Sequence, residues 1–89
     1  MTTMFVRHTV SDYKTWRKAY DDFAPVQKAK GVTAQAVYRA ADNPNDITVT
    51  HEFASLEAAQ AFATSAELKS AMQNAGVAGA PTIWFTNKA

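Results

Sequence analysis

Two histidines are the residues of this 89-residue chain best suited to acid–base chemistry. His51 falls in the alternating run ITVTHEF, and His8 falls in the alternating run TMFVRHTV near the start of the chain. In each run the histidine shares one face with apolar residues, so both imidazoles are expected in apolar surroundings. A neutral, desolvated imidazole suits general base catalysis because its pKa lies near neutrality. His51 and His8 are therefore the candidate catalytic residues.

The strands that must position these histidines are predicted from alternation of apolar and polar residues. They cover residues 3–10, 33–40, 47–53 and 82–86. The polar residues from Asp42 to Asp46 are predicted to be the loop of a hairpin between the two middle strands. One helical region lies between the first and second strands and another between the third and fourth. The predicted order of elements is therefore β, α, β, β, α, β.

The helices are predicted from side-chain spacing and capping residues. Aromatic residues three and four apart form one stripe after Asp12, and Pro25 breaks or kinks that helix. Ser55 and Ser65 are predicted caps of two further helical segments. The whole order predicts a single α+β domain over residues 1–89 with a ferredoxin-like βαββαβ fold. In this fold both helical regions cover one face of a four-stranded antiparallel sheet, with strand order 4-1-3-2.

A pocket between sheet and helices follows from this arrangement. Both histidines are expected to point into it, and a hairpin closed around residues 42–46 puts alanines beside His51 and Tyr38 opposite Val49. Such a pocket is mostly apolar with a few polar groups, which is typical of small-molecule sites. The candidate substrate-binding residues are Trp16, Tyr20, Tyr38, Phe62 and Met72. The competing interpretation is that these aromatic residues and both histidines are simply core.

The other sheet face has no helix of its own chain to cover it. It is expected to mix aromatic, apolar and charged side chains, a composition typical of interfaces. We therefore expect a homodimer in which two sheets pack together, since two-fold dimers are the commonest oligomers. A monomer with a solvated sheet is the alternative. The residues expected on this face include Phe5, Arg7, Gln35, Val37, Arg39, Glu52 and Trp84.

Composition excludes several classes of function. The net charge is +1 and no basic run exists to bind phosphates, so nucleic acid is not an expected partner. The chain has no cysteine, which excludes thiolate catalysis and disulfides. Two histidines without a third ligand predict neither a metal site nor another cofactor. No apolar run approaches 18 residues, so no membrane contact is expected and the protein is predicted to be cytoplasmic.

Three segments carry a resemblance to a known family: RHTVSDYKTW, RAADNPNDITVTHEF and SAELKSAMQNAGVAGAPTIWF. They resemble the small dimeric α/β-barrel proteins grouped with antibiotic biosynthesis monooxygenases and polyketide cyclases, and in particular short uncharacterised bacterial members. The resemblance implies a homodimeric barrel but not one reaction, because these relatives include cofactor-free oxygenases, cyclases, isomerases and haem-degrading enzymes. The second helical region lacks the Trp and Tyr associated with quinone-forming relatives, and the His that haem-degrading relatives use.

The leading hypothesis is a homodimeric protein that binds a small aromatic or polyketide-like molecule, with cofactor-independent monooxygenation as the first reaction to consider. One alternative is a non-catalytic ligand-binding or stress-response protein. Another is a cyclase or isomerase that uses a histidine as general base and works without oxygen.

Overall fold

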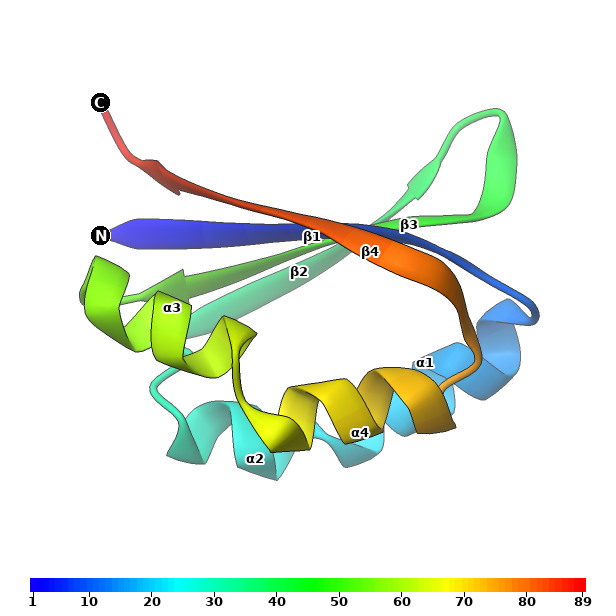
Figure 1. Ribbon diagram of the computed structural model, residues 1–89. Helices are drawn as coiled ribbons and strands as arrows, with labels where there is room; N and C mark the ends of the chain where they lie inside the picture. Colours follow the sequence, from blue (N-terminus) through cyan, green and yellow to red (C-terminus); the bar gives the residue numbers. More distant parts are fainter.

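The fold is a four-stranded antiparallel sheet covered on one face by four short helices (Figure 1). The computed structural model describes residues 1–89. The elements are β1 (Thr2–Val10), α1 (Tyr13–Asp22), α2 (Ala24–Ala29), β2 (Ala34–Ala40), β3 (Asn43–Phe53), α3 (Leu56–Ala63), α4 (Ala66–Asn74) and β4 (Val77–Asn87). The strand order is β2-β3-β1-β4. The predicted ferredoxin-like arrangement is confirmed, and the sheet of one chain is open, not a closed barrel.

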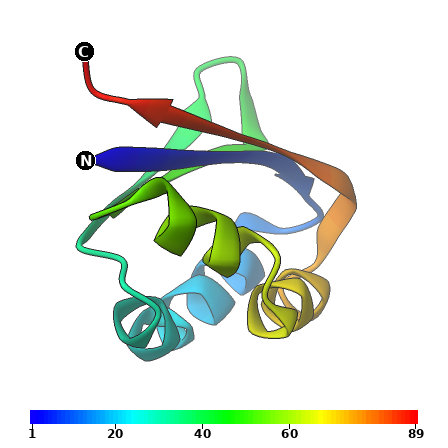
Figure 2. The same cartoon turned by 60° about the vertical axis from the view of Figure 1, so that its left-hand side comes forward.

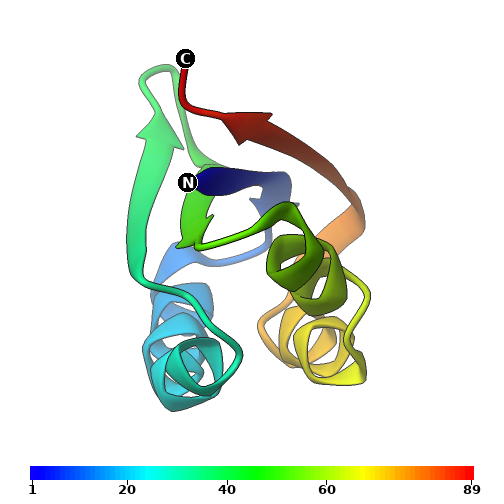
Figure 3. The same cartoon turned by 90° about the vertical axis from the view of Figure 1, so that its left-hand side faces the viewer.

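The helices form two pairs beneath the sheet, α1 with α2 under the β2 side and α3 with α4 under the β4 side (Figures 2 and 3). Asp12 caps α1 by accepting a hydrogen bond from the Thr15 N–H. Ser55 and Ser65 cap α3 and α4 as the sequence predicts. Pro25 lies in the first turn of α2, where its missing N–H costs no helical hydrogen bond. These caps let four helices of six to ten residues fit along one sheet.

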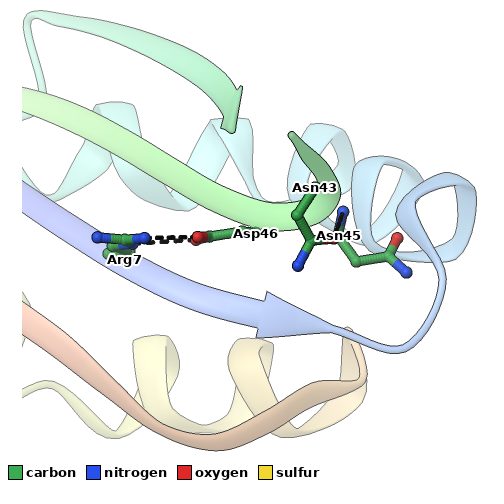
Figure 4. A network of polar contacts seen from close by, with 4 residues as sticks. All are labelled: Arg7, Asn43, Asn45 and Asp46. Atoms are coloured by element: carbon green, nitrogen blue, oxygen red, sulfur yellow. Dashed lines mark hydrogen bonds and ion pairs between the residues drawn. The ribbon is translucent and has the colours of Figure 1, made fainter. Parts of the chain in front are cut away.

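The hairpin between β2 and β3 differs from its predicted form. Its turn is Ala41–Asp42, and β3 already begins at Asn43. Ala40 pairs with Asn43 but Arg39 pairs with Ile47, so the intervening residues form a bulge. The Asn43 Oδ1 atom accepts a hydrogen bond from the Asn45 N–H at 3.1 Å (Figure 4). The predicted five-residue loop is therefore mostly a bulged start of the third strand.

One ion pair and one hydrogen bond from an arginine to a backbone carbonyl hold this bulge in place. The Arg7 guanidinium donates to both carboxylate oxygens of Asp46, at 3.0 and 2.6 Å (Figure 4). The Arg39 Nε atom donates to the Pro44 carbonyl at 2.9 Å. Both contacts tie the bulge to neighbouring strands, and together they fix the register of the hairpin.

The bulge moves the register by one residue, which exchanges the two faces of β2. Gln35, not Ala36, is paired with His51, and Val37, not Tyr38, is paired with Val49. The predicted position of Tyr38 in the pocket is therefore wrong: its side chain lies on the open face and is 58% exposed. The predicted position of Val37 on the open face is equally wrong, because it packs against the helix-side core.

The last strand is longer than predicted. It starts at Val77 instead of Thr82, and it pairs with β1 on both sides of an irregularity between Arg7 and Thr9. Gly79 lies in this early part with φ +72°, a conformation that favours glycine. No helix of the structure is both long enough and apolar enough to cross a membrane.

Candidate functional site

Both histidines lie on the helix-covered face of the sheet, as the alternation predicts. His51 on β3 is paired with Met4 on β1 and is 3% exposed. Its ring centroid lies 5.4 Å from that of Phe62 and 6.1 Å from that of Tyr20. His8 on β1 is 7% exposed, with its ring centroid 5.6 Å from that of Trp16. Aromatic rings from the helices therefore shield both imidazoles from solvent.

A short hydrogen-bond chain orients the His51 ring. The Tyr20 hydroxyl donates to Gln35 Oε1 at 2.7 Å and lies 3.4 Å from His51 Nε2. A phenol has one proton to donate, so the contact with His51 needs a proton on Nε2. That tautomer leaves His51 Nδ1 as a bare acceptor, and this buried atom has no hydrogen-bond partner in the protein. Nδ1 is therefore the atom of His51 that is free to take a proton.

Burial sets the charge of these groups. It lowers the pKa of His51 to about 4, so the imidazole is neutral at neutral pH. Burial also lowers the pKa of His8, while the nearby Asp46 carboxylate acts in the opposite direction. The pKa of Tyr20 is raised to about 12, again by burial, so its hydroxyl keeps its proton. The site thus presents two neutral bases and a neutral phenol.

Gln27 is a polar residue of this site that sequence reasoning missed. It lies on α2, is 3% exposed, and its Nε2 atom has no hydrogen-bond partner in the protein. A buried amide without a hydrogen-bond partner lowers the stability of the fold. Gln27 shares this property with His8 and His51, which also have buried nitrogen atoms without partners. The sequence does contain a pattern that predicts its position. Gln27 follows Phe23 by four residues, so it continues the aromatic stripe of α1 past Pro25.

These side chains line a small pocket between the sheet and the helices α1, α2 and α4. The pocket has a volume of about 40 Å³. A site needs roughly 10–15 Å³ to hold one water molecule, so the pocket can hold water. The lining residues are Val6, His8, Trp16, Ala19, Tyr20, Phe23, Gln27, Val49, His51, Leu68, Ala71, Met72 and Ala75.

The predicted substrate-binding residues are distributed unequally around this pocket. Trp16, Tyr20 and Met72 line it. Phe62 does not line it but packs behind His51 and against Phe53, with ring centroids 5.6 Å apart in the second contact. Tyr38 lies on the other side of the sheet. The structure thus brings four of the five close to His51 or His8 and separates the fifth from them.

The chemistry available here is proton transfer in apolar surroundings. No group of three or more His, Cys, Asp or Glu side chains lies close enough together to hold a metal ion. The neutral imidazoles can accept a proton, and the Tyr20 hydroxyl, whose own proton goes to Gln35, holds the His51 ring in place.

A comparison with protein families decides to which group this fold and pocket belong. The sequence model of the antibiotic biosynthesis monooxygenases matches residues 6–74, which is most of the chain and includes both histidines. The chain belongs to this family. The predicted resemblance is thereby confirmed, although no curated protein matches the sequence.

Several solved structures share the fold at low sequence identity. A protein from Bordetella bronchiseptica assigned to the antibiotic biosynthesis monooxygenases is 15% identical, with a TM-score of 0.82 over 99% of this chain and 96% of that one. SnoaB, a cofactor-independent oxygenase from Streptomyces nogalater, is 11% identical, with a TM-score of 0.79 over 99% and 92%. A Nitrosomonas europaea protein of unknown function, NE2512, is 21% identical, with a TM-score of 0.75 over 96% and 85%.

Proposed function

We propose that this member of the family binds a small aromatic or polyketide-like molecule and oxidises it with molecular oxygen, without a cofactor. The observation that carries the proposal is the buried, unpartnered Nδ1 atom of His51 in a pocket that also holds His8 and Tyr20. The structural neighbour SnoaB, described as a cofactor-independent oxygenase, supports the reaction type. Strongly perturbed titratable groups in an apolar pocket are typical of functional sites.

The proposed reaction starts with proton transfer from an activated CH₂ or phenolic OH group to His51 Nδ1. The resulting anion gives up electrons to oxygen, a C–O bond forms, and loss of water leaves a carbonyl. For an anthrone the balance is one CH₂ group plus one O₂ giving one C=O group plus one H₂O. Tyr20 stays protonated and holds the His51 ring through Nε2, which leaves Nδ1 to accept the proton of the substrate.

The low pKa of His51 makes this proton transfer costly but workable. A phenol has a pKa of about 10 in water, roughly six units above that of His51, so transfer costs about 8 kcal/mol. A turnover of about 10 per second corresponds to a total barrier of about 16 kcal/mol. Attraction between the imidazolium and the substrate anion lowers the cost further in apolar surroundings. The proton transfer therefore fits within the barrier of an ordinary enzyme.

We also propose that the protein forms a homodimer in which two chains pack through their open sheet faces. Phe5 and Trp84 stack on this face with ring centroids 5.2 Å apart and planes 4° from parallel. Trp84 is 39% exposed and Tyr38 is 58% exposed. Exposed aromatic rings rimmed by threonines and an Arg7–Asp46 pair are typical of an interface, and a second sheet would cover them.

Oxygen uptake with 1,8-dihydroxyanthrone, an electron-rich anthrone, tests the proposed reaction. We expect the wild-type protein to consume one O₂ per anthrone and to release the anthraquinone, faster than the spontaneous oxidation measured without protein. Replacing both histidines, His8→Gln with His51→Gln, should reduce this rate at least a hundredfold, the usual contribution of a general base. Unfolding curves of the double variant check that it is folded.

Two tyrosines provide a matched control. Tyr20→Phe should slow the reaction roughly tenfold because the phenol contacts His51, whereas Tyr38→Phe on the opposite face should leave the rate unchanged. Full activity of the folded double histidine variant would contradict the general base. Conversion of substrate without oxygen would instead indicate a cyclase or isomerase.

A further inference from the structure

A second, larger hollow lies next to the histidine pocket, between α4 and the first half of β4. Its volume is about 570 Å³, compared with about 40 Å³ for the histidine pocket. Small-molecule sites usually have about 300–1,000 Å³, so only the larger hollow has the volume for an aromatic ring system. We call this hollow the α4–β4 groove; its walls include Thr64, Lys69, Gln73, Val77, Pro81 and Ile83.

The groove and the histidine pocket share two wall residues, Leu68 and Met72. Both lie on α4, one turn apart, so they form a partition between the two spaces. Leu68 is buried, while Met72 is only partly buried. A methionine side chain is unbranched and flexible, so it can change rotamer at low cost. Met72 is thus the natural point at which a ligand in the groove reaches the histidines.

One cationic side chain, Lys69, lines the groove. Lys69 on α4 is exposed and takes part in none of the three ion pairs of the structure, which join Arg7 to Asp46, Arg17 to Asp21 and Lys30 to Glu67. No aspartate or glutamate lines the groove. The hydroxyls of Thr64 and Ser65 already donate to backbone carbonyls of α3. An unpaired ammonium beside an apolar wall suits a flat ring that carries a negative group.

We propose that the α4–β4 groove binds a planar aromatic carboxylate or phenolate, with its anion beside Lys69 and its ring against Val77 and Ile83. Met72 forms the movable partition through which the reactive carbon of the ring reaches His51. The binding site itself needs no reaction, but the second statement rests on the proposed function.

Titration with 2-naphthoate, followed by the backbone amide resonances of the ¹⁵N-labelled protein, tests the site. We expect the amides of Lys69, Gln73 and Ile83 to shift, and those of Phe5 and Thr50 on the open face to stay unchanged. Lys69→Gln should weaken 2-naphthoate binding about three- to fivefold, the size of one exposed ion pair, and should not affect the neutral 2-naphthamide. Lys18→Gln, which removes an exposed lysine of α1 away from the groove, is the matched control.

The partition is tested in the same titration. The Hε1 resonance of His51 should shift when 2-naphthoate binds, and Met72→Phe should abolish that shift while the groove amides still respond. Shifts confined to the open face, or equal binding of 2-naphthoate by Lys69→Gln and wild type, would overturn the proposed groove. These results are separate from oxygen uptake: binding without oxidation of the anthrone would reject the proposed function alone, and oxidation without groove shifts would reject the groove alone.

Discussion

The two faces of the sheet have opposite relations to water. On the helix-covered face, apolar side chains such as Met4, Val6 and Phe53 are almost fully buried, and the same layer contains polar histidine nitrogens without partners. On the open face, the Phe5–Trp84 stack and Tyr38 expose aromatic surface. Buried polar atoms without partners lower stability, and exposed aromatic clusters favour association. This contrast supports our two proposals, that chemistry takes place on the covered face and that the open face contacts a second copy of the chain.

The largest expected effect comes from a charge on the open face. Trp84→Glu puts a carboxylate into the centre of the proposed interface, where burying it unpaired costs about 3–5 kcal/mol. We expect the dissociation constant of the dimer to rise at least a hundredfold, measured by sedimentation velocity. Lys18→Glu on α1 should leave the dimer intact. A monomeric wild-type protein, or a Trp84→Glu variant that dimerises normally, would contradict the proposed dimer interface on this face.

The buried His51 on the covered face should make the free energy of unfolding depend on pH. The pKa of His51 is about 4 in the folded protein and about 6.5 in the unfolded chain, so the unfolded chain binds more protons between these values. The free energy of unfolding should therefore fall as pH drops from about 6.5 to 4, by about 3 kcal/mol from this residue.

Urea unfolding at pH 7 and pH 4 measures this loss. His51→Gln should lose less stability than the wild type over the same interval, since carboxylates such as Asp46 titrate in both proteins and cancel in the difference. Equal losses in the two proteins would show that His51 is not a buried neutral imidazole.

A smaller effect sharpens the comparison between faces. Tyr20→Phe removes the oxygen that His51 Nε2 contacts, and a buried donor left without a partner costs about 1–2 kcal/mol of stability. Tyr38→Phe removes a hydroxyl from an exposed side chain and should change stability by less than 0.5 kcal/mol, roughly the scatter of surface substitutions. Thermal unfolding of the two variants under identical conditions gives both values. Equal effects would contradict the placement of the two tyrosines.

The sequence predicted the fold and the positions of both histidines because alternation reports which face a strand residue occupies. It failed at Tyr38 because the register of β2 depends on the bulge at Asn43–Asp46, which loop composition alone does not reveal. Gln27 was missed because Pro25 was taken to end the aromatic stripe. The size of the histidine pocket and the adjacent groove depend on how α4 packs, which no local pattern encodes. The dimer and the catalytic roles stay predictions.

Native mass spectrometry of the freshly purified protein tests the central contrast between the faces most directly. We expect a dimer of two 9.7 kDa chains that retains the small added mass of an aromatic ligand. A monomer without added mass, at concentrations where small homodimers persist, would contradict this expectation. The open face would then be exposed to solvent, and the covered face would have bound no ligand.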